Sequence, residues 1–156
     1  MTLPPVVSNT SAIIALAQVG QLDLLPRLFT QVTIPVAVRN ELGPTFVMPG
    51  WLIEKSSAQP ISAQVLNVQL GKGESEAISL AVELQARWVI LDDRPARRLA
   101  EALGLPLIGT LGILLAAKRH GFVASVRPVL DSLASFRFHI APALRERVLV
   151  DAAEVP

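Results

Sequence analysis

Short, continuously apolar segments alternate with helical segments along most of this chain, and this alternation limits the fold more than any other feature. Strands that are apolar on both faces must be covered on both faces, which is typical of a parallel sheet flanked by helices. The sequence therefore predicts an α/β fold with a short, mainly parallel central sheet. The predicted strands are Val6–Ser8, Gln31–Ile34, Trp51–Lys55, Trp88–Leu91 and Pro106–Ile108.

Helical periodicity fills the intervals between these strands. No internal repeat, low-complexity tract or dividing linker interrupts the pattern, so we expect a single domain over residues 1–156. The part after Gly121 is expected to be mainly helical, and its pattern allows an edge strand at Arg137–Ile140. The predicted helices are Thr10–Val19, Leu22–Phe29, Pro35–Leu42, one from after Pro60 to Leu70, Glu74–Gln85, Pro95–Leu103 and Leu111–Arg119.

The composition is unusually apolar for a domain of this size. Hydrophobic residues make up 51% of the chain, charged residues make up 17%, and the mean hydropathy is +0.49. Polar residues nevertheless break the apolar stretches within about ten residues, whereas a spanning helix needs roughly 20. The first residues also lack the basic segment of a secretory signal. We therefore expect no membrane span, and instead a homodimer or a complex with another protein that covers apolar surface.

The cysteine content excludes some kinds of binding site, whereas the net charge excludes none. The chain has no cysteine, which excludes a disulfide framework and thiolate metal ligands and fits a cytoplasmic protein. The net charge of +1 says little about partners. Most of the basic residues are arginines, which suit bidentate contacts to phosphate or carboxylate.

Acidic and amide side chains follow the strands or lie at the ends of neighbouring helices. In a parallel sheet, sites gather at the carboxyl ends of the strands, so these side chains are the candidates for chemistry. An oxygen-rich set without cysteine suits Mg²⁺ or Mn²⁺, and metal-assisted phosphodiester hydrolysis is the reaction that such a site favours. The alternative is that these groups are solvated helix ends that interact with helix dipoles. The residues are Asn9, Glu41, Glu74, Glu76, Asp92 and Asp93.

Hydroxyl and arginine side chains adjoin the acidic positions. The hydroxyls of Thr10 and Ser11 can contact a metal-bound water or a phosphate, but they can equally cap a helix. Arg94, Arg97 and Arg98 share one helical face and can bind RNA phosphates. The alternative for the arginines is a solvated face in which Arg97 pairs with Glu101.

The histidines and aromatic residues give a weaker signal. His120 and His139 lack metal-ligand spacing, so we expect structural or exposed roles for both. The two tryptophans and five phenylalanines are too dispersed in the sequence to indicate a base-stacking platform.

An ordered set of short motifs resembles a known family. Val6-Val7-Ser8-Asn9-Thr10-Ser11, Leu22-Asp23-Leu24-Leu25, Val32-Thr33-Ile34-Pro35 and Val38-Arg39-Asn40-Glu41-Leu42 resemble the opening of a PIN domain. Gly73-Glu74-Ser75-Glu76-Ala77-Ile78, Val89-Ile90-Leu91-Asp92-Asp93 and Leu107-Ile108-Gly109-Thr110-Leu111-Gly112 resemble its DUF3368 branch. The resemblance runs from about Val6 to about Leu133, so it implies a PIN-like core over residues 6–133 and a helical C-terminal extension over residues 134–156.

PIN domains are metal-dependent ribonucleases, and many are VapC-type toxins held by a small antitoxin. The resemblance therefore implies a three-layer α/β/α sandwich, a Mg²⁺ or Mn²⁺ site, RNA as substrate and an antitoxin as partner. Carried over position by position, it implies that Asn9, Glu41, Glu74 and Asp92 are metal ligands, with the three carboxylates as catalytic residues. Glu76 and Asp93 can substitute for or assist them. Asn9 departs from the family pattern, which has aspartate there, so one negative charge is missing.

Three functions are therefore in competition. The first is a PIN-type ribonuclease that acts as the toxin of a type II toxin–antitoxin pair. The second is a degenerate PIN-like module that binds RNA or a protein without cleavage, and Asn9 favours it. The third is a phosphoacceptor or nucleotide-binding domain. It is disfavoured because the acidic pair at Asp92 and Asp93 comes late in the chain and no glycine-rich fingerprint is present.

Overall fold

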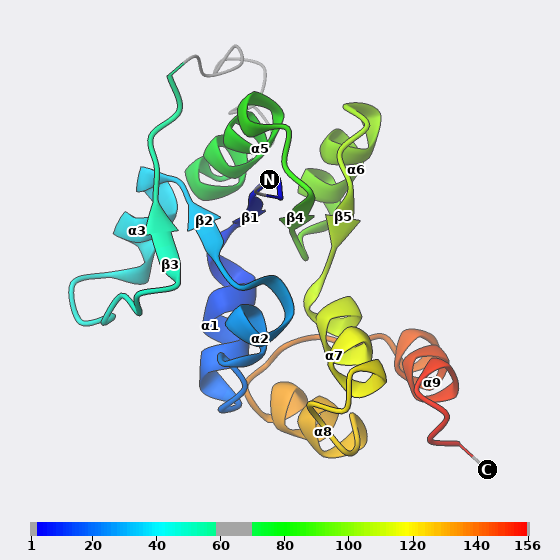
Figure 1. Cartoon of the computed structure of the whole chain (residues 1–156). Helices are drawn as coiled ribbons and strands as arrows, with labels where there is room; N and C mark the ends of the chain where they lie inside the picture. The colour runs from blue at the N-terminus through cyan, green and yellow to red at the C-terminus, as the bar shows by residue number, and fades with distance from the viewer. Residues whose placement is uncertain (1–2, 59–69, 156) are drawn as a thin grey trace.

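The computed structural model describes residues 3–58 and 70–155. At its centre lies a sheet of five parallel strands in the order β3-β2-β1-β4-β5 (Figure 1). The chain first adds β2 and β3 on one side of β1 and then β4 and β5 on the other. All five strands lie within the segments predicted from the sequence, and their parallel pairing confirms the expected fold class. The strands are β1 (Val6–Ser8), β2 (Val32–Ile34), β3 (Leu52–Glu54), β4 (Trp88–Ile90) and β5 (Leu107–Ile108).

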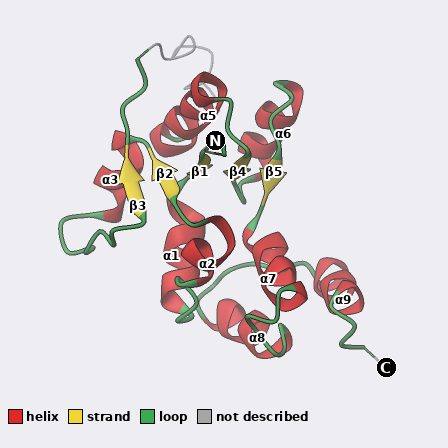
Figure 2. Ribbon diagram, in the orientation of Figure 1, coloured by secondary structure: helices red, strands yellow, loops and turns green. Residues whose placement is uncertain are grey.

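Eight helices in the described part of the chain surround this sheet (Figure 2). The helix expected between Pro60 and Leu70 falls almost wholly on residues 59–69, outside the described residues. None of the helices within the described ranges combines the length and apolar character that crossing a bilayer requires. The helices are α1 (Thr10–Gln18), α2 (Leu24–Phe29), α3 (Val36–Leu42), α5 (Lys72–Leu84), α6 (Arg94–Ala102), α7 (Thr110–Arg119), α8 (Arg127–Ser135) and α9 (Pro142–Asp151).

Two apolar clusters, one on each face of the sheet, hold the layers together. Successive strand residues point to opposite faces, so Val6 and Ile90 join one cluster whereas Val7 and Val89 join the other. The first cluster includes buried side chains of α1, α2, α7 and α8, and the second includes those of α5 and α6. Helices therefore cover both faces, and the three-layer α/β/α sandwich expected from the sequence is confirmed.

The edge strand expected at Arg137–Ile140 is wrong. Helix α8 ends in a Schellman motif, in which Arg137 takes the left-handed conformation with φ 65°. The Phe138 N–H donates to the Leu133 carbonyl at 3.0 Å, and the Arg137 N–H donates to the Ala134 carbonyl at 3.1 Å. The first amide groups of this segment are thus used to close the helix, and they are not free to extend the sheet.

Glu154 ties the end of the chain to the loop between α7 and α8. Its carboxylate, 10% exposed, accepts hydrogen bonds from Lys118 Nζ at 2.8 Å, Ser125 Oγ at 2.5 Å, the Val126 N–H at 2.7 Å and the Arg127 N–H at 3.1 Å. Burial by itself raises the pKa of this carboxyl group. The hydrogen bonds from Lys118, Ser125 and the two backbone amides outweigh that effect and lower the pKa to about 2.

The lowered pKa makes the contribution of Glu154 to stability dependent on pH. The folded pKa of about 2 lies below the ordinary value of 4.5, so the carboxylate stabilises the fold above pH 4.5 and loses this effect as the pH falls towards 2. We expect Glu154→Gln to lower the free energy of unfolding at pH 7 by about 2 kcal/mol, as for hydrogen bonds to a charged group. Urea unfolding at pH 7 and at pH 3 measures this, and the difference from wild type should shrink at pH 3.

Glu146→Gln is the matched control, because Glu146 lies exposed on α9. This substitution should leave the free energy of unfolding unchanged at both pH values. Equal effects of the two substitutions at pH 7 would contradict the role given to Glu154.

Candidate functional site

The strand order contains a topological switch between β1 and β4. The sheet continues through β2 and β3 on one side of this pair and through β5 on the other. Ligands of parallel α/β sheets bind at the carboxyl ends of the strands at such a point. Asn9 follows β1 directly, and its backbone N–H donates to the Ile90 carbonyl of β4 at 3.2 Å. Asp92 follows β4 after one residue, so the two candidate residues lie at the same edge of the sheet.

Asn9 is buried, with 1% of its surface exposed. Its side-chain Nδ2 donates to Ser11 Oγ at 3.1 Å. Its Oδ1 is also buried and has no hydrogen-bond partner among the described residues. A buried carbonyl oxygen without a donor is unfavourable, and either a cation or a donor from a bound molecule would satisfy it.

Glu41, near the end of α3, joins the starts of two other helices. Thr10 Oγ1, at the first residue of α1, donates to Glu41 Oε1. The Gly73 N–H, in the first turn of α5, donates to Glu41 Oε2 at 3.0 Å. A Cβ atom at Gly73 would lie 2.8 Å from Oε2, so a side chain at position 73 would displace the Glu41 carboxylate. Glu41 is therefore fixed relative to β1 through Thr10, although its residue is exposed overall.

Asp92 binds the start of α7 with both oxygens. The Thr110 N–H donates to Asp92 Oδ1 at 2.8 Å, and Thr110 Oγ1 donates to Asp92 Oδ2 at 2.6 Å. Thr110 is fully buried. A Cβ atom at Gly109 would lie 2.8 Å from Asp92 Oδ1, so a side chain at position 109 would displace the Asp92 carboxylate. Two carboxylates of the site are thus each held by a threonine at the first residue of a helix and approached by a glycine.

Two other acids cap helices. Asp93 is the N-cap residue of α6, and its Oδ2 accepts a hydrogen bond from the Ala96 N–H at 3.1 Å. Glu76 Oε1 accepts from the Ala37 N–H, in the first turn of α3, at 3.1 Å. Asp93 and Glu76 thus make contacts at helix ends, as in the alternative interpretation of the acidic residues. Glu76 also links α5 to the helix that carries Glu41.

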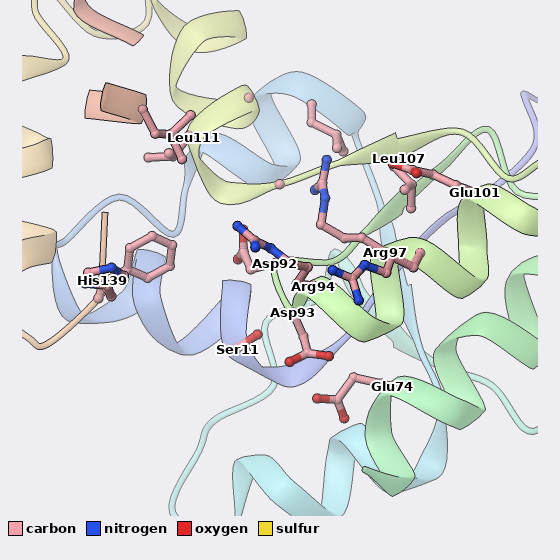
Figure 3. Close-up of a pocket in the computed structure, with 16 residues that line it drawn as sticks. Ser11, Glu74, Asp92, Asp93, Arg94, Arg97, Glu101, Leu107, Leu111 and His139 are labelled. Atoms are coloured by element: carbon pink, nitrogen blue, oxygen red, sulfur yellow. The ribbon is translucent and has the colours of Figure 1, made fainter. Parts of the chain in front are cut away.

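A cleft of about 880 Å³ opens beside the carboxyl end of β4. Four of the predicted polar site residues and all three predicted arginines line it, whereas Asn9, Thr10, Glu41 and Glu76 are not among the lining residues. Figure 3 shows the carboxylates of Glu74 and Asp93 pointing towards a common space. The predicted residues in the lining are Ser11, Glu74, Asp92, Asp93, Arg94, Arg97 and Arg98.

The arginines differ in what they contact. Arg94 and Arg98 are exposed at the cleft. Arg97 is partly buried, and its Nη1 donates to the Leu91 carbonyl at 2.7 Å. The pairing of Arg97 with Glu101 that the sequence left open is not among the ion pairs of the described residues. Arg94 and Arg98 therefore have guanidinium groups available to an anionic ligand.

The cleft also contains residues that the sequence did not single out. Phe138, His139 and Leu144, from the end of α8 and the start of α9, line it together with Leu111 and Ile108. Their positions depend on how α8 and α9 fold back against α7, which no local pattern reveals. The sequence interpretation took the phenylalanines as too dispersed for a platform and His139 as structural or exposed, although Phe136, Phe138 and His139 lie close together in the chain.

Comparison with protein-family models identifies the chain. The model of DUF3368, described as a PIN domain, matches residues 5–154. The chain belongs to this PIN-domain family. No curated protein matches it significantly. PIN domains are nucleases that generally use divalent metal ions. The oxygen atoms at the ends of β1 and β4 are therefore the candidate ligands of such an ion.

The donor set of this DUF3368 site fits a hard divalent cation. It consists of oxygen atoms alone, and it includes the unpartnered Asn9 Oδ1. The described residues contain no group of three acidic, histidine or cysteine side chains close enough to bind one ion together. Mg²⁺ keeps several water ligands and binds through one or two carboxylates, so spaced carboxylates remain compatible with it.

Substitution of Thr110 in this PIN domain tests how much its hydroxyl contact with Asp92 contributes to the stability of the fold. We expect Thr110→Val to lower the free energy of unfolding by about 1–2 kcal/mol, because a partly buried Asp92 oxygen loses its hydroxyl donor while the side-chain shape is kept. Thr110→Ser keeps the hydroxyl and should lose less. Thermal unfolding of the three proteins measures the difference. Equal stability of the valine and serine variants would show that the hydroxyl contact contributes nothing.

Proposed function

We propose that the protein is a divalent-metal-dependent ribonuclease of the PIN type, with Mg²⁺ or Mn²⁺ as its ion and RNA as its substrate. The observation that supports this most is the cleft beside β4, in which Glu74, Asp92 and Asp93 share one space with arginine side chains. Carboxylates suit a hard cation, and arginines suit the phosphates of a nucleic acid. A cleft that contains both carboxylates and arginines suits phosphodiester hydrolysis better than a cleft with only one of these two sets.

The residues of the site would take different roles. When bound, the ion supplies an activated water molecule and stabilises the leaving oxygen. The Thr10 and Thr110 hydroxyls orient two of the carboxylates without neutralising them, since a hydroxyl carries no charge. Glu76 holds the start of α3 and so supports the helix that carries Glu41. The residues proposed to hold the ion are Asn9, Glu41, Glu74 and Asp92, with Asp93 as an additional carboxylate. One or two of the carboxylates would bind it directly, and the others through its water ligands.

RNA would bind along the arginine side of the cleft. Arg94 and Arg98 are exposed there, close in sequence to Asp92 and Asp93. Their guanidinium groups can each make two hydrogen bonds to a phosphate. Ser11, which lines the cleft at the start of α1, offers a hydroxyl to the phosphate or to a bound water. Binding through phosphates should weaken as the salt concentration rises.

One specific observation favours a second candidate function, a degenerate PIN module that binds RNA or a protein without cleavage. Asn9 stands where PIN domains usually have aspartate, and an amide oxygen gives a cation a dipole where a carboxylate gives a full charge. The two oxygens of Asp92 are also both occupied by donors of Thr110. The remaining charge favours at most one weakly bound ion and slow or absent cleavage of single-stranded RNA.

Metal titration of substituted proteins separates the two functions. We expect Asn9→Asp to tighten Mn²⁺ binding by about tenfold, or roughly 1.4 kcal/mol, because it restores one negative charge. It should also raise any cleavage of single-stranded RNA, whereas Asp92→Asn should abolish both. Calorimetry with Mn²⁺ and a cleavage assay with labelled RNA measure these effects.

Asp23→Asn is the matched control, because Asp23 is exposed at the start of α2 and does not line the cleft. It should leave metal binding and cleavage unchanged. If wild type cleaves rapidly and Asn9→Asp changes nothing, Asn9 does not belong to the metal site. If Asn9→Asp binds Mn²⁺ tightly but still does not cleave RNA, the protein is a binding module.

We also propose that the protein acts as the toxin of a type II toxin–antitoxin pair, and that it forms a homodimer or a stable complex with the antitoxin. Membership of a PIN family supports this role, and the apolar composition supports the association. Large hydrophobic side chains are exposed on α1 and α9 and at the C-cap of α6: Ile14 is 39% exposed, Val150 55% and Leu103 44%. A partner that covers these side chains would remove apolar surface from water.

Sedimentation equilibrium of the purified chain tests the association. We expect a mass of about twice the 16.7 kDa of the monomer at micromolar concentration. A strict monomer at high concentration would contradict the homodimer. A monomer that forms a stable complex when co-expressed with a neighbouring small reading frame would favour the antitoxin.

A further inference from the structure

The cleft has two walls of different chemistry. One wall is charged, with Asp92, Asp93, Arg94 and Arg98 from the end of β4 and from α6. The other is apolar and aromatic. In Figure 3, His139 and Leu111 lie across the cleft from Arg97 and Glu101. The apolar and aromatic lining residues are Leu107, Ile108, Leu111, Phe138, His139 and Leu144, of which Leu107 lies beside Glu101 in Figure 3.

The aromatic wall is fixed by backbone geometry. The hydrogen bond from the Phe138 N–H to the Leu133 carbonyl, at 3.0 Å, closes the Schellman motif at the end of α8. On the other side of the segment, Arg145 of α9 forms an ion pair with Asp131 of α8 at 2.6 Å. The backbone of the segment that carries Phe138 and His139 is therefore joined to α8 at both ends.

Phe138 is only partly buried. It packs against the larger apolar cluster of the core and also lines the cleft. His139 is exposed beside it. A flat aromatic surface at the edge of a charged cleft is what a stacked nucleobase needs, and stacking on an aromatic side chain tolerates any base.

We propose that Phe138, with His139 beside it, forms a stacking subsite for one nucleobase of single-stranded RNA, next to the phosphate held at the charged wall. This inference rests on the proposed function, because it takes RNA as the ligand of the cleft. A nucleotide joins an anionic phosphate to a flat, weakly polar base, and the two walls match these two parts. Bases inside an RNA duplex are already stacked on one another, so the subsite selects unpaired RNA.

Fluorescence anisotropy with two probes tests the subsite, in EDTA so that no cleavage occurs. One probe is a labelled oligouridylate, and the other is an abasic oligonucleotide with the same number of phosphates. We expect Phe138→Ala and Phe138→Leu to weaken binding of the oligouridylate by about tenfold, since stacking contributes strongly to each bound base. Binding of the abasic probe should stay as in wild type. The leucine variant keeps the apolar packing and removes only the aromatic surface.

Phe136→Ala is the matched control, because Phe136 is 47% exposed on the same segment but does not line the cleft. It should bind both probes as wild type does. Equal affinities of the Phe136 and Phe138 variants for oligouridylate, or retention of full affinity by Phe138→Leu, would overturn the subsite and leave the proposed function intact. Equal losses for both probes would also overturn it, because the effect would then be structural. If wild type binds neither probe, both the subsite and RNA as the ligand are overturned.

Discussion

The pairing of β1 with β4 is the contact on which the candidate site depends. Val6 lies opposite Trp88 and Ser8 opposite Ile90, so the two strands end at the same level. The chain places β2 and β3 on one side of β1, and it places β4 and β5 on the other side. The helices that follow β1 and β4 therefore diverge. The space left between them is where Asn9, Asp92 and the cleft lie. A slip of this register would separate the strand ends and remove the site.

The alternation of apolar strands and helices was sufficient to predict the parallel sheet, and the residues after the strands indicated the edge of the sheet at which Asn9 and Asp92 lie. What the sequence could not reveal is how the carboxylates are held. The contacts of Glu41 with Thr10 and of Asp92 with Thr110 join residues far apart in the chain, through helix packing that has no local signal. The turn at Arg137 was missed for a different reason. A φ near 65° is typical of glycine, so an arginine at this position does not predict a turn.

The kind of donor around each carboxylate has an electrostatic consequence. Glu41 and Asp92 receive hydrogen bonds from hydroxyl and backbone N–H groups, which stabilise negative charge without cancelling it. Arg97 lies close to Asp92, yet its guanidinium donates to the Leu91 carbonyl, and the described residues contain no ion pair between the two side chains. Glu41 and Asp92 thus have no ion-pair partner among the described residues, and Arg94 and Arg98 are exposed at the cleft.

The two walls of the cleft have separate structural origins. The charged wall comes from the sheet edge and α6, whereas the aromatic wall comes from the turn after α8 and the start of α9. Helix α9 is held to the rest of the fold by its buried Val148 and Leu149, and the chain just beyond it by the network around Glu154. The C-terminal part is therefore more than a covering layer, because it supplies Phe138, His139 and Leu144 to the lining of the cleft while every carboxylate of the lining comes from other parts of the chain.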